Sequence, residues 1–242
     1  MITFSRLGNY GRLGNQMFQY ASIIGIAKKN NFDYCFPLTG TEISKWFNLT
    51  AKDETVRKKQ VELYKFSFEP KMFQLPDNLD YCGYFQTEKY FEHCEDFIRK
   101  EYSFKEEVTE VVDEWFSEQE EYISVHVRRT DYLNISNVHP TLSLDWYHEA
   151  MDYFPGKKFL IFSDDPVWCA DNFKDETFSP FDNAGEDMYA MTKCKGHIVA
   201  NSSFSWWGAW LGKNRTIAPK IWFGSSGYKD WQDIYCKDWQ IL

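Results

Sequence analysis

Apolar and polar positions follow two different periods along this chain, and each period predicts a kind of element. Short apolar runs bounded by polar residues, such as 122–127 (YISVHV) and 158–163 (KFLIFS), are typical of buried strands. In 15–29 the apolar residues instead recur at roughly helical spacing, with Asn15 as the expected N-cap. The expected strands are 1–4, 33–36, 79–85, 122–127, 158–163, 197–200 and 215–218, and the expected helices are 15–29, 88–102, 106–118, 144–153, 166–173, 184–194 and 204–211.

Strands and helices alternate along most of the chain, which favours parallel sheets covered by helices. Residues 37–80 interrupt this order, because they are polar and irregular. We therefore expect an α/β fold with two units, 1–118 and 119–225, followed by a C-terminal segment, 226–242, that packs back on the body.

The composition is that of a folded protein and excludes several classes. Of the 242 residues, 19% are aromatic, so the chain has ample apolar surface to bury. The net charge of −9, without a basic tail, is unsuited to neutralising phosphates along a polymer, and we expect no nucleic-acid partner. The six cysteines are scattered without a C-x-x-C pair, which favours buried free thiols over a zinc site.

The same residues bear on the protein's location. The N-terminus lacks the pattern of a signal peptide, and no apolar run approaches the ~18 residues that a transmembrane helix needs. We expect a cytoplasmic protein without a transmembrane segment. Peripheral contact with the inner face of a membrane and the oligomeric state stay open.

The strongest local motif is HVRRTD (126–131), at the carboxyl end of an expected strand. Ligands of open parallel sheets bind outside such strand ends, and guanidinium groups suit bidentate contact with phosphate. Adjacent side chains of an extended segment point in opposite directions. One arginine is therefore expected to face the crevice while the other braces the loop through Asp131. A salt-bridge cluster that merely closes a loop explains the same residues equally well.

Two further motifs follow expected strands. In FSDD (162–165), one carboxylate is expected to cap the helix that starts at Pro166, which leaves the other to accept from a ribose or a base; capping by both is the alternative. In NSSF (201–204), hydroxyl groups open a helix whose free N–H groups suit an anion. The tryptophans after Phe204 are expected chiefly in the core.

The glycine-containing segment GRLGNQ (11–16) follows the first expected strand. It matches neither the dinucleotide fingerprint nor the Walker loop, so by itself it indicates an ordinary strand-to-helix turn. The sequence also lacks D-x-D, which argues against a metal-bridged sugar-nucleotide site. The five histidines show no metal-ligand spacing, and we expect no metal and no cofactor.

Taken together, four motifs in this order resemble the α-1,2-fucosyltransferases of the family 11 glycosyltransferases: GRLGNQMFQYA (11–21), HVRRTDY (126–132), FSDD (162–165) and NSSFSWWGAWL (201–211). The resemblance implies a GT-B-like fold, with two Rossmann-like domains facing a central cleft. It places the acceptor on the N-terminal domain and the donor, GDP-fucose, on the C-terminal domain. It also implies an inverting, metal-independent transfer of L-fucose to the 2-hydroxyl group of a galactose residue in an oligosaccharide or glycolipid.

Site residues follow from the same resemblance. Arg128 is expected to contact the pyrophosphate and to stabilise the departing GDP in place of a metal, with Asp131 and His126 as further catalytic residues. The donor-binding residues implied are Gly14, Asn15, Gln16, His126, Arg128, Arg129, Asp131, Ser163, Asp164, Asp165, Asn201, Ser202, Ser203 and Phe204.

Several alternatives remain at this point. The base that removes the acceptor proton is Asp131 or His126, with His139 as a weaker candidate, or there is none and the route is dissociative. The donor is another GDP-sugar, or the linkage is a different one. In a different class, the aromatic content fits a carbohydrate-binding module without catalysis, although such a module has no need of paired arginines.

Overall fold

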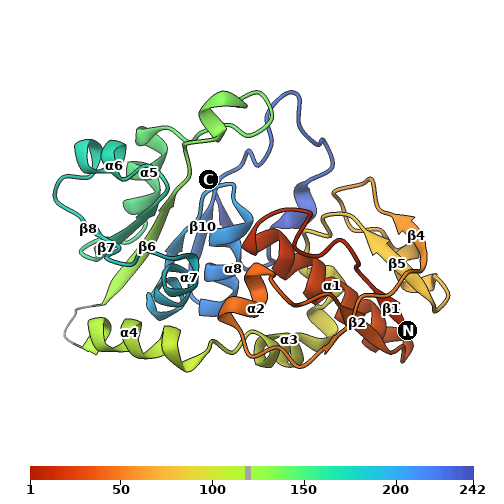
Figure 1. The fold of residues 1–242 in the computed structure, drawn as a ribbon. Helices are drawn as coiled ribbons and strands as arrows, with labels where there is room; N and C mark the ends of the chain where they lie inside the picture. The colour runs from red at the N-terminus through yellow and green to blue at the C-terminus, as the bar shows by residue number, and fades with distance from the viewer. Residues whose placement is uncertain (118–120) are drawn as a thin grey trace. The chain divides into compact units, whose positions relative to one another are not determined.

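The structure is a computed structural model, and it describes residues 1–117 and 121–242 of the chain. The described residues form two compact units (Figure 1). The first comprises Met1–Lys105 with Asp230–Cys236, and the second comprises Glu106–Lys229 with Lys237–Leu242. Among these residues, no helix has the length and apolar character required to cross a membrane.

The first unit contains a five-stranded parallel sheet in the order β3-β2-β1-β5-β4. Its strands are β1 (Ile2–Thr3), β2 (Tyr34–Phe36), β3 (Lys52–Asp53), β4 (Lys59–Glu62) and β5 (Leu79–Cys82). Its helices are α1 (Leu13–Asn30), α2 (Glu42–Trp46) and α3 (Glu95–Glu101), with the 3₁₀ turns η1 (Pro70–Gln74), η2 (Glu88–Tyr90), η3 (Glu92–Cys94) and η5 (Gln232–Ile234).

Three sequence predictions for this unit were wrong in detail. Helix α1 begins at Leu13, two residues before the expected N-cap Asn15, and the residue at the cap position is Arg12. The expected helix 88–102 is broken into η2, η3 and α3, because neither Phe91 nor Cys94 has helical backbone angles. Residues 37–80, expected to be irregular, supply α2, η1 and the strands β3 and β4.

The second unit contains a six-stranded parallel sheet in the order β11-β10-β9-β6-β7-β8. Its strands are β6 (Tyr122–Val127), β7 (Lys158–Ser163), β8 (Thr177–Phe178), β9 (His197–Ile198), β10 (Thr216–Ala218) and β11 (Gln240–Ile241). Its helices are α4 (Glu106–Ser117), α5 (Leu144–Met151), α6 (Pro166–Asn172), α7 (Ala184–Lys193) and α8 (Ser203–Gly212), with the 3₁₀ turn η4 (Tyr132–Asn134). Read from β8 to β11, this is the doubly wound Rossmann order, whose direction reverses between β6 and β9.

Side chains of β6 alternate between two cores, as a strand buried on both faces requires. Ile123, Val125 and Val127 pack with α5 and α6, whereas Tyr122 packs with α4 and α7. Figure 1 shows α5 and α6 on one side of this sheet and α4 and α7 on the other. By the same alternation, His126 points to the α7 side. Trp206 and Trp207 of α8 are fully buried, as expected.

The unit boundaries differ from the expected ones. The expected division after Glu118 lies outside the described residues, but α4 before it belongs to the second unit, because Val112 and Trp115 pack in the core with Tyr122. The expected C-terminal segment 226–242 is also divided. Asp230–Cys236 belongs to the first unit, whereas β11 adds a strand to the second sheet beside β10.

Candidate functional site

The three motifs of the second unit meet at one edge of its sheet. HVRRTD follows β6, FSDD closes β7, and NSSF follows β9, and these three strands are parallel neighbours. Their carboxyl ends therefore lie together, at the point where the strand order reverses. In doubly wound sheets this switch point forms the crevice that binds ligands.

The guanidinium group of Arg128 lies between two carboxylates. Its Nη2 is 2.6 Å from Oδ1 of Asp131, and its Nη1 is 3.0 Å from Oδ2 of Asp164. The side chain of Arg128 is 15% exposed, so the charge is partly shielded from water but reachable. An arginine held in this way is a preorganised site for an anion.

The two carboxylates differ in how firmly they are held. Asp164 also accepts hydrogen bonds from the backbone N–H of Arg129, at 2.9 Å, and from the hydroxyl of Thr130. Burial by itself would raise the pKa of Asp164, but these hydrogen bonds and the charge of Arg128 hold it below its usual value. The side chain of Asp131 is 40% exposed. Asp164 is thus a fixed brace, whereas Asp131 is the accessible partner.

Arg129 braces the neighbouring loop. Its Nε is 3.1 Å from Oδ2 of Asp165, and its guanidinium carbon lies 3.9 Å from the ring centre of Trp168. Asp165 also caps α6 by accepting from the N–H of Trp168, which confirms that one carboxylate of FSDD is a helix cap. The backbone N–H of Asp165 donates to the hydroxyl of Ser163. We expected the bracing arginine to act through Asp131; instead Asp131 contacts Arg128, and Asp165 serves Arg129.

His126 is buried beside this cluster. Its ring lies 5.5 Å from the ring of Phe204, and among the described residues its Nδ1 has no hydrogen-bond partner. Burial, and secondarily the charge of Arg128, lowers the pKa of His126 to about 3. The imidazole is therefore neutral at physiological pH and only weakly basic.

The NSSF segment closes the site on the β9 side. The buried amide of Asn201 donates to the carbonyl oxygens of Pro140 and Trp222, at 3.0 and 3.1 Å. Ser202 caps α8 by accepting from the N–H of Phe204. Ser203 and Phe204 form the first turn of α8 and are half-buried. The start of α8 thus opens at the same sheet edge as Arg128.

The remaining predicted site residues belong to the first unit. Gly14, Asn15 and Gln16 form the first turns of α1. The amide of Gln16 donates to the carbonyl of Gly11 and accepts from the N–H of Glu42, while Asn15 accepts from Gln86. Internal hydrogen bonds therefore engage both amides, and their approach to a donor stays a prediction.

The structure adds aromatic residues that the motifs did not assign. Tyr132 lies under Arg128, with 5.3 Å between the guanidinium carbon and the ring centre. His139 stacks on Tyr132 at 4.7 Å between ring centres and 22° between ring planes. The sequence pointed to His139 only as a weak candidate base. Tyr132 follows Asp131 directly, so its place in the motif was the one available signal.

A perturbed carboxyl group also escaped the sequence reasoning. Asp187, in the first turn of α7, accepts a hydrogen bond from the hydroxyl of Ser179. Burial raises the pKa of Asp187 to about 6, and the nearby carboxylates of Glu186 and Asp182 act in the same direction. The sequence gives no sign of this, because acidic residues are ordinary in a first helical turn.

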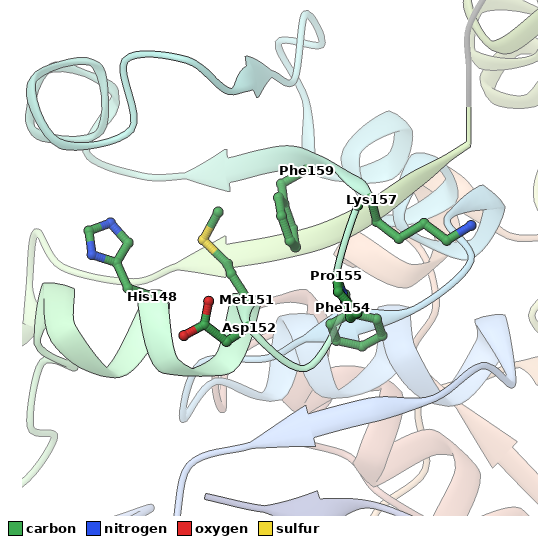
Figure 2. A pocket seen from close by; sticks show the side chains of 8 residues that line it. His148, Met151, Asp152, Phe154, Pro155, Lys157 and Phe159 are labelled. Carbon is green, nitrogen blue, oxygen red and sulfur yellow. The ribbon is translucent and has the colours of Figure 1, made fainter.

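A cavity of about 320 Å³ lies elsewhere in the second unit (Figure 2). Its lining includes His148 and Met151 of α5 and Phe159 at the start of β7. These residues lie toward the amino end of the sheet, whereas the motifs follow the carboxyl ends. None of the predicted site residues lines it, so this cavity is no part of the candidate site. Within residues 1–117 and 121–242, no three His, Cys, Asp or Glu side chains are grouped so as to hold a metal ion.

Comparison with known proteins gives the family. The chain matches the profile described as Glycosyl transferase family 11 over residues 6–242. An Escherichia coli protein named alpha-1,2-colitosyltransferase is 30% identical, and the match covers 92% of this chain and 92% of that protein. Galactoside alpha-(1,2)-fucosyltransferase 2 of Bos taurus is 26% identical, with 86% of this chain and 68% of that protein covered.

Solved structures share the fold. The crystal structure of NodZ alpha-1,6-fucosyltransferase soaked with GDP-fucose is similar to this chain with a TM-score of 0.58 over 91% of this chain and 94% of that chain. At 14% identity, the likeness concerns the fold alone. It confirms the expected class, an α/β fold of the GT-B type with Rossmann-like units.

The profile match and the match to the colitosyltransferase each extend over nearly the whole chain, and the profile match includes all four motifs. The expected enzyme class, a glycosyltransferase, is thereby confirmed over the alternative of a binding module without catalysis. The chain belongs to glycosyl transferase family 11 and is homologous to α-1,2-fucosyltransferases over most of its length.

Proposed function

We propose that this enzyme transfers L-fucose from GDP-fucose to the 2-hydroxyl group of a galactose residue in an oligosaccharide or glycolipid, with inversion and without a metal ion. The observation that carries the proposal is Arg128, a preorganised guanidinium at the switch point of the second sheet. The names of the relatives support the sugar and the linkage.

In this reaction the acceptor oxygen forms a bond to the anomeric carbon of fucose while the bond from that carbon to the β-phosphate oxygen breaks. The electron pair leaves with GDP, so negative charge develops on the pyrophosphate. Arg128 is the residue placed to stabilise that charge, with the first turn of α8 at Ser202, Ser203 and Phe204 as a second source of donors. These groups take the electrostatic role that a metal has in other transferases.

Both terminal nitrogens of Arg128 already contact carboxylates, so a pyrophosphate that pairs bidentately with them takes the place of one carboxylate. Asp164 has two further donors, whereas Asp131 is more exposed. The pyrophosphate therefore replaces Asp131 beside the guanidinium.

Displaced from Arg128, Asp131 becomes available to accept the proton of the acceptor hydroxyl. Of the three candidate bases it is favoured by exposure, since His126 is buried and only weakly basic. His139 stacks on Tyr132 and contacts the tilted ring of Phe223, and burial lowers its pKa as well.

A second donor has specific support. The relative at 30% identity is named for colitose, which is L-fucose without its 3-hydroxyl group. Parallel assays with GDP-fucose and GDP-colitose, on a panel of galactose-terminated acceptors and with product linkage determined by NMR, distinguish the two. Transfer from GDP-colitose alone would replace fucose in the proposal and leave the mechanism intact.

The role of Arg128 is tested by Arg128→Ala at saturating acceptor. Loss of this contact is expected to raise the barrier by ~2–4 kcal/mol, or roughly 30- to 1,000-fold in turnover. Arg215→Ala is the matched control, because Arg215 lies just before β10, at the opposite end of the strands, where it bonds the carbonyl of Tyr153 and the amide of Gln240. Near wild-type turnover of Arg128→Ala would contradict the proposed site.

A further inference from the structure

Two loops that follow the carboxyl ends of β6 and β10 are hydrogen-bonded to each other. The first, 131–140, follows β6, and the second, 219–229, follows β10. The N–H of Gly224 donates to the carbonyl of Val138 at 2.9 Å, and the N–H of Ser226 donates to the carbonyl of Asn137 at 2.8 Å. The loop that carries Asp131 is thus backed by a segment far from it in sequence.

Asn201 fastens both loops to the sheet. Its side-chain amide donates to Pro140 on the first loop and to Trp222 on the second, and its backbone carbonyl accepts from the hydroxyl of Tyr132 at 3.1 Å. Asn201 is 1% exposed, so these bonds are protected from water. This residue, expected to bind the donor, is built as an anchor for the two loops.

A continuous row of rings runs from Arg128 through these loops. The guanidinium lies over Tyr132, Tyr132 stacks on His139, and the ring of His139 lies 5.1 Å from that of Phe223. Phe223 in turn contacts Tyr228 at 5.4 Å between ring centres. His139 is the link in this row between the two loops.

We propose that His139 and Phe223 are positioning residues, which act through Tyr132 to hold the guanidinium of Arg128 in the orientation that transfer requires. Part of this inference rests on the proposed function, since it assigns a consequence for turnover. The geometric part, that the row fixes Arg128, does not depend on which sugar is transferred.

The row matters because the other contacts of Arg128 change during the reaction. When the pyrophosphate displaces Asp131, the guanidinium loses one carboxylate that had oriented it. Tyr132 is held independently of the two carboxylates, because its hydroxyl donates to the backbone carbonyl of Asn201 and His139 stacks on its ring. Burial lowers the pKa of His139, so the ring is neutral at physiological pH and adds no charge that would compete with Arg128.

The variants His139→Ala and His139→Phe separate packing from ring chemistry. Alanine removes the stack on Tyr132, whereas phenylalanine keeps an aromatic face without the imidazole nitrogens. His148→Ala is the matched control, because His148 belongs to the same unit and contacts an aromatic ring, Phe173, that is not part of the row. His139 is half-buried, and its replacement is expected to leave the fold intact.

The first readout is the Nε–Hε NMR signal of Arg128, assigned with Arg128→Lys. Because the guanidinium carbon lies 5.3 Å from the centre of the Tyr132 ring, the ring current is expected to shift this signal in the wild type. The shift is expected to shrink in His139→Ala, to return in His139→Phe and to be unchanged in His148→Ala. The second readout is kinetic: His139→Ala is expected to lower kcat by roughly tenfold to a hundredfold with a smaller change in the donor KM, and His139→Phe to recover most of it.

An Arg128 signal unaffected by His139→Ala would overturn the proposal, as would equal kinetic defects in the alanine and phenylalanine variants. If the wild type transfers no sugar from any GDP-sugar, the proposed function fails. The NMR comparison then still decides whether the row positions Arg128.

Discussion

His197, a buried residue of the second sheet, makes the stability of the folded protein depend on pH. It is 1% exposed, and its Nδ1 lies 2.8 Å from the hydroxyl oxygen of Ser124 on the neighbouring strand β6. Burial lowers its pKa to about 3, against 6.5 for an ordinary histidine. Between these values the unfolded chain binds a proton that the folded chain excludes, so stability falls as the pH falls from 6.5 toward 3.

The variant His197→Asn removes this titration and keeps a polar group beside Ser124. The wild type is expected to be more stable at pH 7.5, because asparagine leaves part of the space unfilled. That advantage should shrink by about 2 kcal/mol on going to pH 5, since one unit of pKa shift corresponds to about 1.4 kcal/mol. Urea unfolding at both pH values measures the difference in free energy of unfolding between the two proteins. If this difference is the same at pH 7.5 and pH 5, His197 is not the source of the pH dependence.

At the same scale, the sequence predicted which charged residues lie at the candidate site but not which arginine pairs with which carboxylate. HVRRTD and FSDD were expected at strand ends because a strand and its flanking polar residues are local features. Which carboxylate meets which arginine depends on how two loops from neighbouring strands pack. The local pattern therefore could not predict that Asp165, and not Asp131, is the partner of Arg129.

At the scale of elements, the turn between β1 and α1 depends on one glycine. Gly11 has φ of +101°, a conformation that side chains disfavour. A Cβ atom there would lie 2.3 Å from Nδ2 of Asn15, and Asn15 is itself bonded to Gln86. Replacing Gly11 by alanine therefore strains the backbone and also brings the new Cβ atom against Asn15, whose side chain is fixed by Gln86.

Gly11→Ala is expected to lower the melting temperature by more than Gly40→Ala. Gly40 has φ of +79° but nothing within 4 Å of its added Cβ, so it reports the backbone strain alone, on the order of 1 kcal/mol. The excess loss at Gly11 measures the clash with Asn15. Equal melting temperatures in the two variants would show that Asn15 moves aside without cost.

Long strands with a clear apolar run were predicted to their bounds, whereas several of the two-residue strands were missed. Strands β6 and β7 match their expected bounds, because six-residue apolar runs can bury both faces. Strands β3, β8 and β11 have two residues each, too few to show any period. The break between η2 and η3 falls at Phe91, whose backbone angles are not helical, and the spacing of apolar residues does not mark it.

At the scale of the whole molecule, the chain passes between its two units three times, after Lys105, Lys229 and Cys236. Nothing in the composition of the C-terminal segment marks the last two crossings, so the sequence suggested one segment that packs back as a piece. The contacts that keep Asp230–Cys236 on the first unit come from its carboxylates. Asp230 accepts from the N–H groups of Phe66 and Ser67 and from the hydroxyl of Ser67.

Asp233 adds to this attachment by accepting from the N–H of Phe68, at 2.8 Å, and by pairing with Lys89. The double variant Asp230→Ala, Asp233→Ala removes the carboxylates that accept from the three amides of 66–68, and each lost bond of this kind is worth about 1 kcal/mol or more. Hydrogen exchange at 66–68 should therefore accelerate, while exchange in β6 stays slow, because that strand belongs to the other unit. Asp238→Ala is the control, an exposed carboxylate of the same segment that lies in the second unit. Unchanged protection at 66–68 in the double variant would mean that packing of Ile234, which is 1% exposed, holds the segment without the carboxylates.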